Sequence, residues 1–153
     1  MKQRECYAYF ARNILSFFQG DKMKYFILTN NSLAAEELGS THEIRFVEGE
    51  LKDVFIEARD IIHQGAVLLN HPLYGSVKPN ETPYRSLLLH LTKSSTDSGC
   101  ASVDPESLRL IGNAVSVCDK FIAKKETTDP RLLQDFQVVD LSLLKSAMES
   151  ADR

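Results

Sequence analysis

The chain has 153 residues, of which 43% are hydrophobic and 25% are charged, and its formal net charge is -3. This length and composition are typical of one soluble domain with room for an apolar core. The small negative charge argues against general affinity for nucleic acid, and no apolar run approaches the roughly 20 residues of a membrane-spanning helix.

Residues 1–22 are predicted to be an amphipathic helical extension in front of a single α/β domain at 23–150. Aromatic and aliphatic residues recur at helical spacing between positions 4 and 18. Arg12 and Asn13 interrupt this apolar pattern, which argues against a secretory signal peptide. We therefore expect the segment to pack on the domain or on a partner.

The first half of the domain alternates strand and helix patterns. Residues 23–28 are predicted to be a strand, followed by a short helix at 33–38. Residues 43–47 alternate polar and apolar side chains, which predicts a second strand. Residues 50–64 carry the periodicity of an amphipathic helix, and a short apolar run at 66–69 predicts a third strand.

The second half is less regular. Residues 87–91 fit either a strand or a helix that starts near Pro83, and the preceding alternation favours a strand. A helix is predicted from 105 to about 124. Apolar residues also recur at helical spacing between 130 and 147, as one helix or two short ones. Together these elements predict a three-layer α/β fold with helices on both faces of an open, mainly parallel sheet of about four strands, Rossmann-like or flavodoxin-like.

Polar residues follow each of the first three predicted strands. They are Thr29, Asn30 and Asn31, then Glu48, then Asn70 with His71. In open sheets of this kind, ligands bind at the carboxyl ends of the strands. Asn31 at the helix start could present amides to an anion, although simple capping is the commoner role.

The segment 71–86 is a long connection with three prolines, which restrict its backbone. We predict that it is ordered and lies at the carboxyl ends of the first and third strands. His71 could act as a general base oriented by Glu48 or Glu81, against the commoner role of a structural histidine. Lys78 and Arg85 could clamp a carboxylate or phosphate, against the commoner fate of solvated surface charges.

The set of candidate ligand-binding residues combines the strand ends with this segment. Its members are Thr29, Asn30, Asn31, Glu48, Asn70, His71, Ser76, Lys78, Asn80, Glu81, Tyr84 and Arg85. His71 and Glu81 are the only candidates for catalysis, and no spacing in the chain is diagnostic of a reaction.

Cofactor and metal motifs are absent from the sequence. It contains neither a GxGxxG nor a P-loop pattern, and no cysteine or histidine spacing suits zinc. We therefore predict no cofactor and no metal. The 3 cysteines are odd in number and lack CxxC spacing, which fits reduced thiols and a cytoplasmic location.

Several segments resemble the GrdX family, small proteins associated with glycine, sarcosine and betaine reductase genes in anaerobic amino-acid fermenters. The similar segments are Ile27–Asn31, Arg59–Gly65, Leu68–Ser86, Asp135–Phe136 and Asp140–Leu143. The resemblance extends roughly from Met23 to Leu144, with the long 71–86 segment the most specific part. Asn70 departs from the threonine expected before His71, and residues 1–22 lie outside the pattern.

The resemblance implies a function but assigns no catalytic residue. It predicts a non-catalytic accessory or regulatory protein of the reductase system that binds a small anionic metabolite or a reductase subunit at the strand ends and the 71–86 segment. The alternative is a small enzyme that acts on a phosphorylated or carboxylated metabolite, with His71 and Glu81 as acid and base. A weaker alternative is an assembly factor that docks through its N-terminal helix.

Overall fold

The structure is a computed structural model that describes residues 25–75, 81–91, 102–120 and 129–153. The predicted extension at 1–22 lies outside these ranges. The elements in chain order are β1 (Tyr25–Thr29), α2 (Ser32–Leu38), β2 (Ile44–Phe46), α3 (Leu51–His63), β3 (Ala66–Leu68), β4 (Ser86–Leu91), α5 (Pro105–Lys120) and α6 (Pro130–Ala151). Within this described part of the chain, no helix is long and apolar enough to cross a membrane.

Most element types agree with the sequence predictions, including the strand at β4. The C-terminal segment is one continuous helix of 22 residues rather than two short ones. Asp129 caps its start by accepting from the Arg131 amide at 3.0 Å. No glycine or proline occurs between Arg131 and Ala151 to interrupt it.

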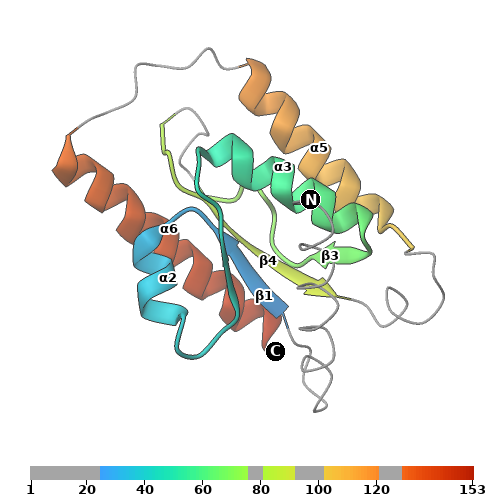
Figure 1. The fold of residues 1–153 in the computed structure, drawn as a ribbon, viewed down its shortest axis with the longest axis horizontal. Coiled ribbons are helices and arrows are strands. Elements are labelled where there is room, and N and C mark those ends of the chain that lie inside the picture. The colour runs from blue at the N-terminus through green and yellow to red at the C-terminus, as the bar shows by residue number, and fades with distance from the viewer. Residues whose placement is uncertain (1–24, 76–80, 92–101, 121–128) are drawn as a thin grey trace, which may run out of the picture.

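The sheet has the strand order β2-β1-β4-β3 (Figure 1). β1 pairs with β2 in parallel, but β4 runs antiparallel to both of its neighbours. The predicted mainly parallel, Rossmann-like or flavodoxin-like sheet is therefore wrong, and the sheet is mixed. The reason is the connection from β3 to β4, whose described residues contain no crossover helix. A parallel neighbour needs such a crossover, whereas this connection re-enters the sheet from the edge where it left.

Strand direction still brings the predicted polar segments to one edge. β3 is antiparallel to β4 and β4 is antiparallel to β1, so β1, β2 and β3 all point the same way. Their carboxyl ends and the amino end of β4 share one edge of the sheet, which we call the rim. Thr29 and Ser86 are paired across the two central strands at this rim.

Helices cover both faces of the sheet (Figure 1). α3 and α5 pack on one face, against alternate residues of the central strands such as Phe26, Leu28 and Leu89. α2 and α6 pack on the other, against Tyr25, Ile27 and Leu88. Because successive side chains of a strand point to opposite faces, the unbroken apolar runs of β1 and β4 are what a sheet buried on both sides requires.

Tyr25 links the start of β1 to the end of α6 and predicts an alkaline loss of stability. Its hydroxyl donates to Asp152 Oδ2 at 3.4 Å. Burial, with a smaller contribution from the Asp152 charge, raises the pKa of Tyr25 from 10.0 to about 12. The protonated phenol is thus favoured in the folded state. Its contribution is complete below about pH 10 and is lost as the pH rises towards 12.

The measurement is urea unfolding of the wild type and Tyr25→Phe at about pH 9 and pH 11.5. Between these values the wild type should lose about 1 kcal/mol more than the variant, since partial solvent contact weakens the effect. Equal losses in the two proteins would show that Tyr25 does not contribute.

Candidate functional site

The rim is held together by a buried carboxylate from the C-terminal helix. Asp140 Oδ1 accepts from the Ser86 amide at 3.1 Å, and Oδ2 accepts from Ser86 Oγ at 2.6 Å and from Asn31 Nδ2 at 3.0 Å. Asp140 is only 3% exposed. Three donors therefore offset the cost of burying this charge, and they tie α6 to β1 and β4.

A chain of hydrogen bonds leads to this carboxylate. The Asn31 amide donates to Thr29 Oγ1 at 2.9 Å, and Thr29 Oγ1 lies 2.8 Å from Ser86 Oγ. Because Ser86 Oγ donates to Asp140, the Thr29 hydroxyl must donate to Ser86. Each hydroxyl has one donor role and one acceptor role filled, so this part of the rim is a satisfied structural network.

Asn31 also caps α2. Its Oδ1 accepts from the amides of Leu33 at 3.1 Å and Ala34 at 3.4 Å. Its Nδ2 donates to the Gln137 carbonyl at 2.9 Å as well as to Asp140. The Asn31 side chain thus bonds the first amides of α2, which were candidates for binding an anion, and so it has the capping role.

Asn30 fastens two loops to the end of β1. Its Nδ2 donates to the carbonyls of Gly49 at 3.1 Å and Pro83 at 2.8 Å, and its Oδ1 accepts from the Arg85 amide at 2.9 Å. Asn70 instead joins the end of β3 to β4, because its Oδ1 accepts from the Leu88 amide at 2.8 Å and its Nδ2 donates to the Ser86 carbonyl at 3.3 Å. The described parts of the 71–86 segment therefore lie at the rim.

Arg85 is the exception in this network, because its charge is buried and the described residues include no acidic partner for it. The residue is 2% exposed. Its Nη1 donates to the Tyr74 carbonyl at 2.9 Å, while its Nε is buried without a hydrogen-bond partner. None of the ion pairs found among the described residues involves it. The interpretation of Arg85 as a solvated surface charge is wrong.

Tyr74 lies beside this cation. The Arg85 Cζ atom is 5.5 Å from the centre of the Tyr74 ring. The Tyr74 hydroxyl is also buried without a hydrogen-bond partner. Burial is the largest cause that raises the pKa of Tyr74 well above its usual value, so the phenol keeps its proton at neutral pH. Two buried donors without acceptors, Arg85 Nε and the Tyr74 hydroxyl, thus belong to residues that are in contact in the fold.

Comparison with known proteins identifies the family. A family model described as GrdX-like protein matches residues 26–149. The chain belongs to this family. The match includes every residue of the rim network, and it confirms the resemblance found in the sequence. Neither the curated proteins nor the solved structures contain a match.

The other predicted site residues of this GrdX-like chain are exposed, half-buried or outside the described ranges. Glu48 and Glu81 are exposed, and Tyr84 is half-buried. His71 is exposed, and its Nδ1 accepts from the Leu73 amide at 3.1 Å. Ser76, Lys78 and Asn80 lie outside the described residues.

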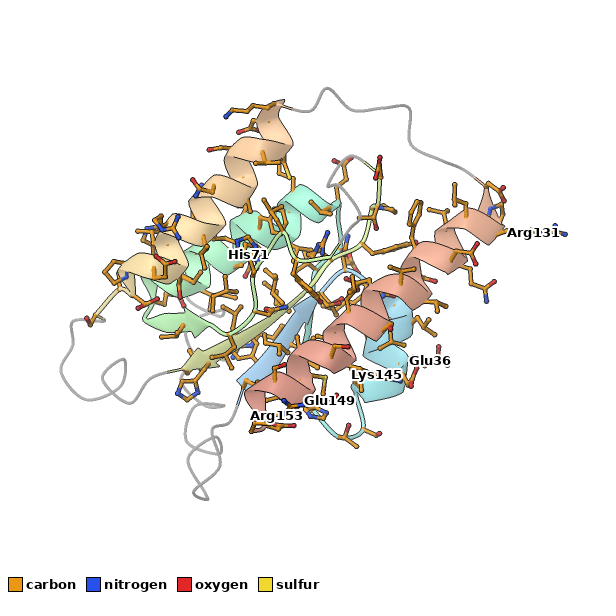
Figure 2. The ribbon with its side chains drawn as sticks, turned by 180° about the vertical axis from the view of Figure 1, so that it is seen from behind. Glu36, His71, Arg131, Lys145, Glu149 and Arg153 are labelled. Carbon is orange, nitrogen blue, oxygen red and sulfur yellow. The ribbon has the colours of Figure 1, made fainter. Side chains whose placement is uncertain are left out.

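His71 is labelled in Figure 2, and it lies close enough to α5 for its charge to act on Glu106. The Arg109 hydrogen bond is the main cause that lowers the pKa of Glu106 on α5, and the charge of His71 adds to it. The bond from the Leu73 amide to its Nδ1 is the kind of backbone contact that a structural histidine makes. Within the described residues, no cluster of three or more acidic, histidine or cysteine side chains could hold a metal ion.

Sequence reasoning did not select Asp140, Ser86 or Tyr74 as site residues. A signal for Asp140 was present, because it occupies the inward face of α6 one turn before the fully buried Leu144. A carboxylate at an apolar position of an amphipathic helix needs buried donors, so it indicates a polar network on the opposing element. No comparable local signal distinguishes Ser86 or Tyr74.

Gly75, in the described part of the 71–86 segment, has a backbone conformation that residues with a side chain rarely adopt. Its φ is 91°, and an added Cβ would lie 2.7 Å from Leu143 Cδ1. Gly75→Ala should lower the free energy of unfolding by about 1–3 kcal/mol, mainly through the positive φ, because the leucine side chain can move.

Gly112 is the matched control, since it lies inside α5 with no atom within 4 Å of the added Cβ. Gly112→Ala should raise the free energy of unfolding by about 0.5–1 kcal/mol. Chemical denaturation of both variants tests the pair. A neutral Gly75→Ala would show that this turn readily adopts another conformation.

Proposed function

We propose that this chain is a non-catalytic accessory or regulatory protein of the glycine, sarcosine and betaine reductase system, acting in the cytoplasm. It binds a small anionic metabolite or a reductase subunit at the rim and the adjoining 71–86 segment. Membership in the GrdX-like family supports the link to this system. One feature of the rim supports a binding site there.

That feature is the buried guanidinium of Arg85. A cation removed from water without an ion-pair partner costs several kcal/mol by general estimates. The neighbouring polar groups are satisfied: Asn30 and Asn31 have protein partners on both ends of their amides, and Asp140 accepts three hydrogen bonds. Among the buried side chains of the described segments, it is Arg85 that retains a charged donor, its Nε, without an acceptor. An anion at Arg85 supplies the missing charge.

The arrangement of the candidate acid and base favours binding over catalysis. General acid–base catalysis needs a histidine nitrogen within reach of the reacting group. One ring nitrogen of His71 already accepts from the Leu73 amide, and the charge of His71 acts on Glu106 of α5. The buried polar groups of the rim hold the backbone in place, which suits a binding platform.

The test is reconstitution with purified reductase components. The protein should co-purify with subunits of one reductase and change its turnover when added in stoichiometric amounts. Arg85→Lys should weaken both effects, because lysine lacks the planar donor fork of arginine. Arg109→Lys, an exposed arginine on α5, is the control and should behave as the wild type. No enrichment of a reductase subunit together with unchanged turnover would refute the proposal.

A further inference from the structure

The unpaired side of Arg85 has a defined shape. A guanidinium offers two edges with paired donors, one formed by Nη1 and Nη2 and one by Nε and Nη2. The Tyr74 carbonyl accepts from Nη1 at 2.9 Å, a bond that does not use the Nε–Nη2 edge. Nε has no partner, and no hydrogen bond of Nη2 is found within the described ranges. The edge that remains carries two parallel, coplanar N–H groups.

The Tyr74 hydroxyl is a second kind of unused donor, and its ring lies beside the guanidinium, with the ring centre 5.5 Å from Arg85 Cζ. Asn70 is the smallest cause that acts on the pKa of Tyr74 and lowers it, the direction expected of an amide hydrogen that approaches the phenol oxygen, so it leaves the phenol hydrogen unused. No hydrogen bond with normal geometry reaches the hydroxyl. Because the phenol stays protonated, its hydrogen is available to an acceptor.

The geometry points to a binding site for one small carboxylate, held side-on by Nε and Nη2 of Arg85 with the Tyr74 hydroxyl as a further donor. This inference rests on the proposed function and names its ligand class. Two coplanar N–H groups match the two oxygens of a carboxylate, the arrangement that makes such pairs bidentate.

Charge favours a carboxylate over a phosphate. Arg85 brings one positive charge, which a monoanion balances. The buried Asp140 carboxylate acts on the Tyr74 hydroxyl, where its charge is the second cause that raises the pKa. A dianion at the same place would be repelled by Asp140, although the three donors to that carboxylate reduce the repulsion.

Burial favours a free acid over a carboxylate on a partner protein. Solvent reaches neither Arg85 Nε nor the Tyr74 hydroxyl. A glutamate or aspartate on another chain would have to carry its backbone to the rim, whereas a free acid needs only a small local opening. The dry surroundings also strengthen each hydrogen bond to the bound anion.

The competing explanation is that Asp140 alone balances Arg85 at longer range and that no anion binds. An acetate titration of ¹⁵N-labelled protein distinguishes the two explanations. The arginine Nε–H resonances are followed by NMR at constant ionic strength. Acetate should shift the Arg85 resonance saturably. Inorganic phosphate should bind roughly tenfold more weakly or worse.

Substitutions of Arg85 and Tyr74 test whether these two side chains contact the bound acetate. Arg85→Lys should weaken acetate binding by roughly tenfold or more, and Tyr74→Phe by several-fold, since each removes a hydrogen bond to a charged group. Arg109→Lys is the matched control and should bind as the wild type. If Arg85→Lys does not fold, the wild-type Arg85 resonance and Tyr74→Phe decide the question.

The inference is overturned by the absence of a saturable shift with acetate, by phosphate binding as tightly as acetate, or by unchanged acetate affinity in Arg85→Lys. These outcomes are separable from those of the proposed function. A reductase effect without acetate binding would retain the accessory role and remove the carboxylate site. Acetate binding without a reductase effect would support the site and remove the accessory role.

Discussion

Asp140→Ala is expected to lower the free energy of unfolding by about 3–5 kcal/mol. The substitution leaves the Ser86 amide, the Ser86 hydroxyl and one hydrogen of the Asn31 side-chain amide without their acceptor in a buried site. Each unsatisfied buried donor costs about 1–3 kcal/mol. The sum is a large fraction of the stability of a domain of this size, so expression at 37 °C should also fall.

Asp135 provides the control, because it lies on the same helix and is exposed. Asp135→Ala should change the free energy of unfolding by no more than about 0.5 kcal/mol. Urea denaturation at neutral pH compares the two variants. Equal, small effects would mean that the carboxylate of Asp140 does not hold α6 to the sheet.

Asn30→Asp is expected to cost at least about 3 kcal/mol although it changes a single atom type. The Asn30 Nδ2 donates to two carbonyl oxygens, those of Gly49 and Pro83. An aspartate keeps the acceptor for the Arg85 amide but places a buried negative charge against both carbonyls. The variant should therefore release the 81–85 segment from β1, and hydrogen exchange of the Arg85 amide should accelerate.

Asn113→Asp is the matched control for the same chemical change at an exposed position on α5. Its effect on the free energy of unfolding should stay within about 0.5 kcal/mol. Wild-type stability and an unchanged Arg85 amide in Asn30→Asp would contradict the hydrogen-bond assignment of the Asn30 side chain.

The predictions for Asp140 and Asn30 concern the stability of the fold, whereas substitution of Arg85 is expected to change ligand binding. Thr29, Asn30, Asn31, Asn70 and Asp140 have protein partners, so their replacement should act first on stability. Arg85 instead carries an unused charged donor, so its replacement should act first on an anion. Variants of the rim must therefore be compared for unfolding and binding together, because loss of binding through unfolding would otherwise be assigned to the wrong residue.

Local sequence determined the elements and the place where polar groups meet. The buried face of α3 can be predicted from the sequence because its apolar residues, from Leu51 to Ile62, recur at the spacing of one side of a helix. The polar residues after β1 and β3 are readable because they follow short apolar runs. Each of these signals lies within about a dozen neighbouring residues, which is the range over which periodicity reports burial.

Tertiary structure alone decided the direction of β4 and the fate of Arg85 and Asp140. The apolar run of β4 fits the sheet in either direction, so its direction depends on how the connection at 69–85 returns to the rim. Asp140 is 54 residues from Ser86 and 109 from Asn31 along the chain. A charge is read from sequence as a surface group unless its partners are local, because burial depends on what distant segments place around it. Only the folded chain therefore distinguished the Asp140 carboxylate, which accepts three buried hydrogen bonds, from the Arg85 guanidinium, for which the described residues provide no acidic partner.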